Sequence, residues 1–289
     1  MIIKFFNEIK EAEYKPTFTS FPDGQPHVKV DSLKWDYDRA EIHCSIRNPK
    51  ELFQLLMVFD VVDKKMPTSV WIYWLFGARM DRAIDDNQPS TFEIVKRCLP
   101  LARAIHILDV HNPKVLPWSS KIDLSPIVQA VLNDFGDCDI YFPDKGAKDR
   151  YGKDFHDYTI LCGRKKRDSQ TGKLSGFELE SGTKTSKRVL ILDDICDGGG
   201  TFIGQYSVLK ELGYEKIGLY TTHGLYTKGM DVLKDFDSIY STNSFQFGLP
   251  TEEGYPTNTQ LVVRKWRKGT DKPHAAFSFG EWEVVKIII

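Results

Sequence analysis

The chain has 289 residues, a formal net charge of −1 and 41% hydrophobic residues. This length is enough for a sizeable core and for two domains or one large α/β domain. A nearly neutral balance gives no overall positive field, so neither nucleic acid nor a membrane is expected as a partner. No apolar run approaches the roughly 20 residues of a membrane-spanning helix. Residues 1–6 are too short, and too soon interrupted by Lys4, for a secretory signal.

The cysteines are scattered, odd in number and without any C-x-x-C spacing: Cys44, Cys98, Cys138, Cys162 and Cys196. This pattern predicts no zinc site and no disulfide framework, and it fits a reducing cytosol. A cytoplasmic location is therefore expected.

Strand-like runs alternate with helical patterns along the chain, which predicts an α/β fold. The first half contains a helix at 49–62, a strand at 68–76, a helix at 90–101 capped by Ser90, and a strand at 104–110. Prolines punctuate a break at 113–126. The second half contains a helix at 127–135, strands at 138–142 and 158–162, a strand–loop–helix unit at 188–212, and strands at 216–222 and 283–289. The alternation predicts two doubly wound sheets with ligand loops at the strand carboxyl ends.

The strongest chemical signal follows the hydrophobic strand at 189–192. The strand leads into Asp193 and Asp194, and then into an acidic, glycine-rich turn that opens a helix: Asp197, Gly198, Gly199, Gly200 and Thr201. The glycines let the backbone approach an anion, and the helix N-terminus supplies N–H donors and partial positive charge. Asp193 and Asp194 would face a ribose diol or its bound metal. The alternative is an ordinary turn with solvated acids, but turns rarely need three glycines and three acids together.

This segment resembles the phosphoribosyl-diphosphate (PRPP) loop of type I phosphoribosyltransferases and of ribose-phosphate diphosphokinases, the PRPP synthetases. The loop alone does not separate the two families. Further motifs resemble the diphosphokinases in the correct order, from about residue 18 to residue 245. The resemblance implies two type I phosphoribosyltransferase-like domains with mostly parallel sheets. Residues 1–124 would bind ATP, and residues 125–289 would carry the ribose-phosphate loop.

Three motifs resemble the nucleotide site of that family. Residues 21–25, F-P-D-G-Q, resemble its adenine-binding F-x-D-G-E, and residues 76–82, F-G-A-R-M-D-R, resemble its Y-A-R-Q-D-R. Residues 108–111, L-D-V-H, are similar to its D-L-H segment, whose histidine helps to bind Mg²⁺ and ATP phosphate. The implied nucleotide-binding residues are Phe21, Asp23, Gln25, Arg79, Met80, Asp81 and His111.

Other motifs resemble the sugar and catalytic sites. Residues 143–150 match P-D-x-G-x-x-x-R, in which the aspartate faces the ribose, and residues 163–167 look like a flexible catalytic loop, K-R-R. T-H-G at 222–224 and T-N at 242–243 match two further landmarks. The resemblance implies catalytic Lys165 and Arg167, and metal contacts from His111 and Asp144. The implied ribose-phosphate set is Asp144, Asp193, Asp194, Asp197, Gly198, Gly199, Gly200 and Thr201.

Singly, each motif has an ordinary explanation. His111 could be a loop histidine, Arg79 and Asp81 surface ion-pair partners, and 164–167 a solvated charged loop. The order of the motifs argues against coincidence. The implied reaction transfers the β,γ-diphosphate of ATP to the anomeric hydroxyl of a ribose 5-phosphate group, with Mg²⁺ as cofactor and AMP released. The implied partners are ATP and a ribose-phosphate substrate, in a homo-oligomer.

Departures from the family pattern keep the acceptor open. Met80 and Gln25 replace the usual glutamine and glutamate, and the segment that normally precedes F-x-D-G-E is missing. Ribose 5-phosphate is the family default. A virus-type variant acts on ADP-ribose in NAD salvage, and such a protein would work in the host cytoplasm. Aromatic residues near the C-terminus would either stack on a second adenine or fill a core: Trp266, Phe277, Phe279 and Trp282.

Two other functions remain open. A phosphoribosyltransferase would use the same PRPP loop without needing residues 79–82 or the Lys165 segment. A non-catalytic regulatory relative would bind nucleotide and assemble with an active subunit. Such a relative should lack the loop lysine, so the presence of Lys165 argues against it.

Overall fold

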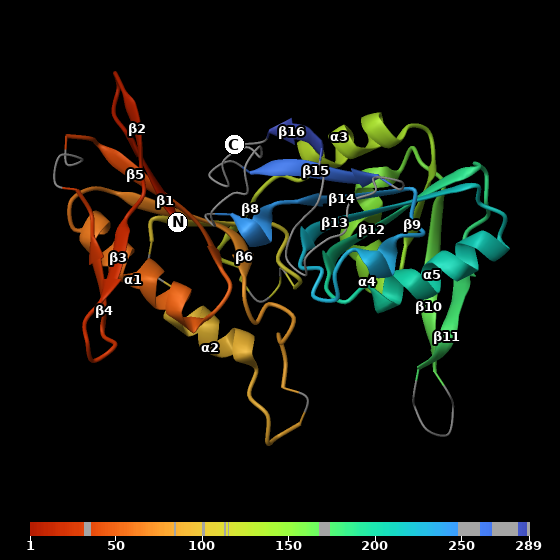
Figure 1. The fold of residues 1–289 in the computed structure, drawn as a ribbon, viewed down its shortest axis with the longest axis horizontal. Coiled ribbons are helices and arrows are strands. Elements are labelled where there is room, and N and C mark those ends of the chain that lie inside the picture. The colour runs from red at the N-terminus through yellow and green to blue at the C-terminus, as the bar shows by residue number, and fades with distance from the viewer. Residues whose placement is uncertain are drawn as a thin grey trace. The chain divides into compact units, whose positions relative to one another are not determined.

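The computed structural model describes residues 1–31, 36–83, 85–99, 102–112, 114, 116–167, 174–247, 261–267 and 283–287. The chain forms two compact units, which are coloured along the chain in Figure 1. The first comprises Met1–Leu124 and a segment that begins at Ser244, and the second comprises Ser125–Asn243 and a segment that begins at Leu261. The units are therefore not two continuous stretches meeting at residue 124, because the short 3-10 helix Ser244–Gln246 (η5) belongs to the first unit.

The first unit contains a six-stranded sheet in the order β2-β1-β5-β6-β7-β8 and a separate two-stranded hairpin, β3-β4. The sheet strands are β1 (Ile2–Phe6), β2 (Glu11–Tyr14), β5 (Arg39–Ile46), β6 (Thr68–Leu75), β7 (Ala104–Ile107) and β8 (Ser120–Lys121). The hairpin strands are β3 (Thr17–Ser20) and β4 (Pro26–Lys29). Strands β5 to β8 run parallel, whereas β1 and β2 add antiparallel at one edge.

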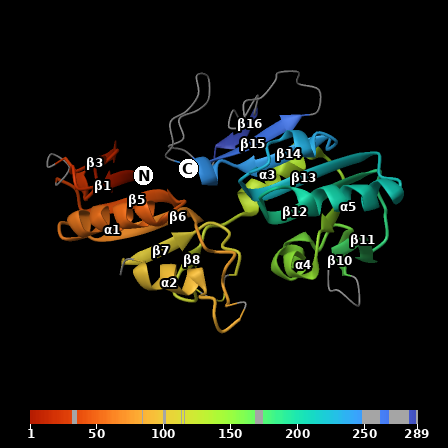
Figure 2. The ribbon, with the colours of Figure 1, turned by 60° about the horizontal axis from the view of Figure 1, so that its bottom comes forward.

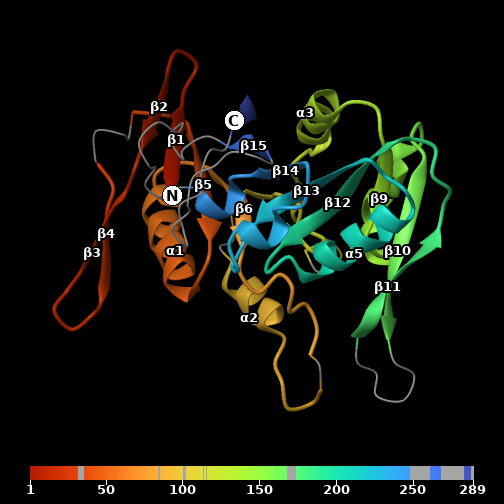
Figure 3. The ribbon, with the colours of Figure 1, turned by 45° about the vertical axis from the view of Figure 1, so that its right-hand side comes forward.

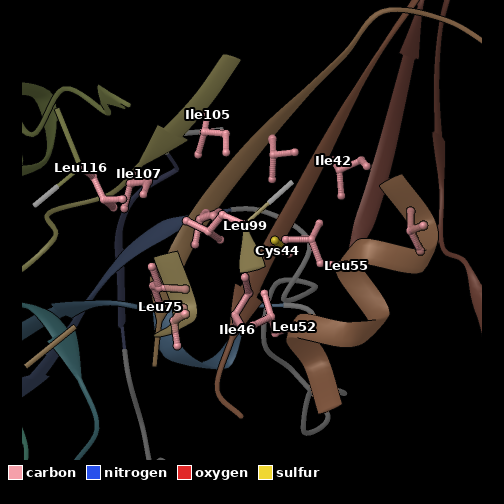
Figure 4. Packing of buried hydrophobic residues seen from close by; sticks show 14 of the residues in the cluster. Ile42, Cys44, Ile46, Leu52, Leu55, Leu75, Leu99, Ile105, Ile107 and Leu116 are labelled. Atoms are coloured by element: carbon pink, nitrogen blue, oxygen red, sulfur yellow. The ribbon is translucent and has the colours of Figure 1, made fainter. Parts of the chain in front are cut away.

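Two helices cover one face of this sheet. The Asn48 side chain caps α1 (Pro49–Asp63) by accepting from the Glu51 N–H. Ser90 caps α2 (Thr91–Cys98) by accepting from the Glu93 N–H, as the sequence predicts. Leu52 and Leu55 of α1 pack with Ile42 and Cys44 of β5 in the core shown in Figure 4. Full burial of each such aliphatic side chain stabilises the fold by about 1.5–3 kcal/mol. This packing fixes the sheet whose strand ends carry the nucleotide motifs.

The second unit contains an eight-stranded sheet in the order β11-β10-β9-β12-β13-β14-β15-β16. Its strands are β9 (Asp139–Phe142), β10 (Ile160–Arg167), β11 (Leu174–Ser181), β12 (Arg188–Cys196), β13 (Lys216–Gly224), β14 (Ser238–Thr242), β15 (Val262–Arg267) and β16 (Glu283–Ile287). The central strands β10, β9, β12, β13 and β14 are parallel, and the other three pair antiparallel at the edges. The protein thus has an α/β fold with mixed, mostly parallel sheets.

Helices cover both faces of the second sheet. They are α3 (Ser125–Phe135), α4 (Lys145–Tyr151) and α5 (Gly200–Glu211), the last following β12 as Figure 2 shows. Tyr141 on β9 hydrogen-bonds to Gln205 on α5, whereas its neighbour Phe142 stacks near Tyr151 on α4. Because successive strand side chains point to opposite faces, α4 and α5 lie on opposite sides of the sheet. Among the described residues, no helix is long and apolar enough to cross a membrane.

The segment expected to be a flexible catalytic loop is part of a strand. Residues 163–167 continue β10 and pair with β11, and Figure 3 shows this hairpin projecting beyond the sheet. Arg164 and Glu178 face each other across the two strands, with Nε 2.6 Å from Oε1. The charge of Arg164, which resembles part of a solvated loop when considered alone, is here compensated by the partner strand.

Candidate active site

The glycine-rich turn joins β12 to α5 in the predicted strand–loop–helix order. Gly199 is the N-cap residue of α5 and has a φ of 76°, in the left-handed region that suits glycine. A Cβ at this position would lie 3.0 Å from Leu233 Cδ2, so a side chain would also be crowded. Gly200 has open space where a Cβ would project. The first amides of any α-helix lack intrahelical acceptors, so those of α5 can bind an anionic group.

The connection after β13 is hydrogen-bonded to this turn. The Thr227 hydroxyl donates to Asp197 Oδ1 at 2.5 Å, and the Thr227 N–H donates to the Asp197 carbonyl at 3.2 Å. The carbonyl of Cys196 accepts from the N–H groups of Leu225 and Tyr226 at 2.8 and 3.2 Å. Backbone hydrogen bonds thus join the connection after β13 to the turn. The side chain of Asp197 accepts a further hydrogen bond from this connection.

The two acids at the end of β12 have different surroundings. Asp194 is buried and forms an ion pair with Arg150 of α4, with Oδ2 2.8 Å from Nη1. Burial first, and then the negative charges of Asp194 and, more weakly, Asp144, raise the pKa of the Asp193 carboxyl well above its usual range. Asp193 is therefore the acid whose protonated form the surroundings favour. Asp194 has an internal cation to compensate its charge.

Asp144 and Lys165 meet beside this acid pair. Asp144 caps α4 by accepting from the Ala147 N–H at 3.1 Å, and its second oxygen, Oδ2, lies 4.0 Å from Lys165 Nζ. Their side chains are 45% and 36% exposed, respectively, so both can reach a ligand. The structure thus brings Lys165 to Asp144, and the charge of Asp144 acts in turn on Asp193. The sequence predicts all three as site residues. The side chain of Arg167 lies outside the described residues.

A buried amide links the segment before Asp144 to the helix that follows the glycine-rich turn. The Gln205 side chain of α5 donates to the Pro143 carbonyl at 3.0 Å and accepts from the Tyr141 hydroxyl. Gln205 is fully buried, so these hydrogen bonds satisfy polar groups that would otherwise be costly. The helix that begins at Gly200 therefore also positions the residue before Asp144.

In the first unit, two nucleotide motifs come together at the ends of β6 and β7. The turn after β6 uses Gly77, with a φ of 78°, and the Met80 carbonyl accepts from the Phe92 N–H and the Ser90 hydroxyl at the start of α2. Asn112 Nδ2 donates to Asp81 Oδ2 at 2.6 Å and so links the segments 76–82 and 108–112. Arg79 and Met80, in the first of these two linked segments, are exposed.

The third nucleotide motif lies at the tip of a hairpin. Phe21, Asp23 and Gln25 occupy the turn between β3 and β4, where the Asp23 side chain accepts from the Gln25 N–H at 3.0 Å. Phe21 is 54% exposed and touches His27 edge-on. Figures 1 and 3 show this tip apart from the turn that carries Arg79 and Met80. Within the first unit, the structure does not bring these two nucleotide motifs together.

Some residues of these sites have no individual role in the sequence prediction. Arg150 pairs with Asp194, and its place at the end of the P-D-x-G-x-x-x-R motif is the only feature of the sequence that points to a role for it. Asn112 and Gln205 belong to no motif and are found only from their contacts.

Among the described residues, no group of three or more His, Cys, Asp or Glu side chains could hold a metal ion. His111 and Asp144 lie in different units.

Comparison with known proteins identifies relatives along most of the chain. The sequence is 28% identical over 253 residues to a ribose-phosphate pyrophosphokinase of Thermococcus kodakarensis, covering 82% of this chain and 86% of that protein. It is 29% identical over 267 residues to a protein of the same name from Pyrococcus abyssi, covering 86% and 89%.

A solved structure supports the fold. The crystal structure of phosphoribosylpyrophosphate synthetase from Mycobacterium smegmatis matches with a TM-score of 0.66 at 17% identity, over 84% of each chain. No model of a known protein family matches the sequence.

Proposed function

We propose that this protein, a relative of the ribose-phosphate pyrophosphokinases, transfers the β,γ-diphosphate of ATP to the anomeric hydroxyl of a ribose 5-phosphate moiety and releases AMP. The observation that carries the proposal is the cluster beside the glycine turn. Lys165 lies 4.0 Å from Asp144, whose charge acts on Asp193, and Asp193 and Asp194 precede the glycine turn that opens α5. This arrangement offers a cation to neutralise the transferred phosphoryl group, carboxylates to bind ribose hydroxyls and backbone amides to bind a phosphate.

Each group has a defined task in this reaction. The anomeric oxygen forms a bond to the β-phosphorus, the bond from that phosphorus to the α-phosphate oxygen breaks, and the hydroxyl proton is released. The amides at Gly199–Thr201 hold the 5-phosphate, while Asp144 and Asp193 orient the ribose hydroxyls. Lys165 neutralises charge on the transferred group, which is the main catalytic need in phosphoryl transfer.

Magnesium fits the proposed site as a metal bound chiefly by substrate. Mg²⁺ is commonly held by one or two carboxylates together with substrate phosphates, and it keeps several waters. The exposed carboxylate of Asp144 offers the oxygen donor that Mg²⁺ prefers, and a closed protein cage is not required. The ion would shield the charge of the triphosphate. We also propose His111 as a contact to the metal–triphosphate complex.

The finer part of the proposal concerns the acceptor. We propose ADP-ribose as the alternative acceptor to ribose 5-phosphate, supported by the altered residues Gln25 and Met80 in the nucleotide motifs. Trp266 gives no support for stacking on a second adenine, because it is 7% exposed on β15. The other aromatic candidates, Phe277, Phe279 and Trp282, lie outside the described residues.

The test is an acceptor panel with ATP and Mg²⁺. AMP release is measured with ribose 5-phosphate, with ADP-ribose and with neither, and phosphorus NMR identifies a diphosphate on the anomeric oxygen. Chelation should stop turnover and added Mg²⁺ should restore it. Diphosphate release from PRPP and a nucleobase, without AMP, would instead indicate a phosphoribosyltransferase. No AMP with either acceptor would favour the non-catalytic relative.

A further inference from the structure

Each of the three glycines of the turn has a different structural environment. Gly199 needs its left-handed backbone, and Gly200 leaves open space at the start of α5. Gly198 has no positive φ among the backbone angles of the described residues. A Cβ at Gly198 would instead lie 3.2, 3.3 and 3.4 Å from Cδ, Cε and Cγ of Lys228. These distances are tighter than ordinary van der Waals contact, so glycine at 198 makes room for the stem of Lys228 across the loop.

The backbone around Lys228 is firmly placed. The Thr227 N–H donates to the Asp197 carbonyl, and the Gly229 N–H donates to the Tyr226 carbonyl at 2.8 Å. Tyr226 has a φ of 49°, which is unfavourable for a bulky aromatic residue, and its side chain is buried. Strained residues of this kind persist where the surrounding structure holds them, and they cluster at functional sites. The turn thus presents Lys228 at a fixed point beside the phosphate loop.

The ammonium group of Lys228 has no assigned protein partner. Lys228 is exposed, and within the described part of the chain it has no hydrogen bond or ion pair to another residue. The nearby Asp197 side chain is engaged by Thr227 instead. The ammonium is one bond beyond Cε, which itself lies over Gly198. A positive charge is therefore available within a few ångströms of the amides that open α5.

We propose that Lys228 is an acceptor-binding residue whose ammonium group contacts a phosphate of the sugar phosphate held at Gly199–Thr201. This inference rests on the proposed function, because it assumes that the turn binds the 5-phosphate of the acceptor. A helix N-terminus supplies only partial charge, whereas a lysine adds a full positive charge that favours dianionic or extended phosphate esters. Lys228 is a binding residue and takes no part in the transfer chemistry. It should therefore act on acceptor affinity and not on kcat.

The experiment compares Lys228→Met, which keeps the stem over Gly198 and removes the charge, with Lys228→Arg. The Met variant should raise the acceptor KM about five- to tenfold, with kcat and the ATP KM nearly unchanged. The Arg variant should recover most of the affinity. Lys234→Met, an exposed lysine on the same connection, is the matched control and should behave as the unchanged protein. High salt should reduce the difference, because the charge is exposed.

Two acceptors distinguish which phosphate is contacted. An equal rise in KM for ribose 5-phosphate and ADP-ribose supports contact with the shared 5-phosphate, and a larger rise for ADP-ribose supports contact with its second phosphate. An acceptor KM within twofold of the unchanged protein for both acceptors, or an equal rise for ATP, would overturn the proposal. Absence of AMP from the unchanged protein would instead overturn the proposed function. In that case, calorimetric titration of ribose 5-phosphate into the unchanged and Met proteins tests Lys228 separately, and equal affinities would refute its role.

Discussion

The ring of Phe177 on β11 lies directly against the backbone of Gly204 on α5. A Cβ at position 204 would overlap with Phe177 Cε2 and Cδ2. Phe177 is the cross-strand partner of Lys165, and Gly204 lies one helical turn after the glycine-rich turn. The helix that begins at this turn and the hairpin that carries Lys165 therefore touch at a point that leaves no room for a side chain at position 204.

The first prediction is that Gly204→Ala lowers turnover. Alanine in a helix interior ordinarily stabilises by about 0.5–1 kcal/mol relative to glycine. Here the new methyl group should push Phe177, and with it Lys165, away from the loop. A misplacement of about 1 Å can cost up to 10²-fold in rate, so kcat should fall between about 10- and 100-fold. The measurement is steady-state AMP release.

The control for this variant is Ile203→Ala, which shortens an exposed neighbour on α5 and should leave kcat unchanged. Adding Phe177→Leu to Gly204→Ala should recover part of the lost turnover, because the smaller side chain relieves the overlap. Full turnover in Gly204→Ala would show that this contact does not position Lys165.

The second prediction concerns Lys165. Lys165→Met should lower kcat by about 10²–10³, as for loss of one preorganised charge at a transition state. Its melting temperature should change little, because the side chain is 36% exposed and its carboxylate partner is 4.0 Å away. Lys187→Met, an exposed lysine paired with Glu215, is the control. Near-normal turnover in Lys165→Met would transfer the assignment to Lys166.

The third prediction concerns the link between the two nucleotide motifs. Asn112→Ala removes the 2.6 Å hydrogen bond to Asp81 and should raise the ATP KM about tenfold, without changing the acceptor KM. Asn87→Ala, in the exposed turn before α2, should change neither constant. The KM values for the two substrates are measured separately at saturating concentration of the other. An equal rise in both would indicate general loss of structure.

The fourth prediction is a pH dependence of stability. The pKa of Asp193 is raised by burial and by the charge of Asp194, so the folded state favours the protonated carboxyl. Its contribution to stability is full below the ordinary Asp pKa of about 3.9 and is lost as the pH rises through the raised value. Asp193→Asn should therefore have a higher melting temperature than the unchanged protein at pH 7–8. The difference should shrink towards pH 4. A constant difference across this range would contradict the assignment, and Asp154→Asn on the exposed surface should show none.

The fifth prediction separates backbone strain from ligand binding. Gly199 and Gly213 both have positive φ, at 76° and 79°, near opposite ends of α5. Alanine at either position should cost about 1–2 kcal/mol of stability. Only Gly199→Ala should also abolish acceptor binding in calorimetric titrations, while ATP binding remains. Equal loss of acceptor affinity in Gly213→Ala would mean that binding responds to general destabilisation.

Local patterns predict the elements on which the site depends. The hydrophobic run before Asp193 and the glycines after it predict β12, the turn and α5, because strand burial and helix initiation are encoded by neighbouring residues. The cap at Ser90 is predicted for the same reason. In contrast, residues 163–167 form a strand only because β11 supplies partners such as Glu178. That pairing is not visible in a charged segment considered alone.

The contacts that refine the site depend on distant parts of the chain. Arg150 and Asp194 are far apart in sequence, as are Asp81 and Asn112, and the pairs form only after the helices and strands have packed. The raised pKa of Asp193 likewise follows from burial, which no motif records. Family resemblance identifies which residues to consider. It does not say which carboxylate is paired with an arginine and which one has its pKa raised by burial.

Because η5 belongs to the first unit, dividing the chain at one point cannot give two fragments that each contain a whole unit. Ser45 donates to the Ser244 carbonyl, Arg47 donates to the carbonyls of Phe245 and Phe247, and Phe247 packs on Tyr73. A fragment ending at residue 124 would lose all these contacts. The other fragment would carry their partners as exposed backbone and aromatic surface. The first unit is therefore complete only once residues more than 100 positions after Leu124 have been synthesised.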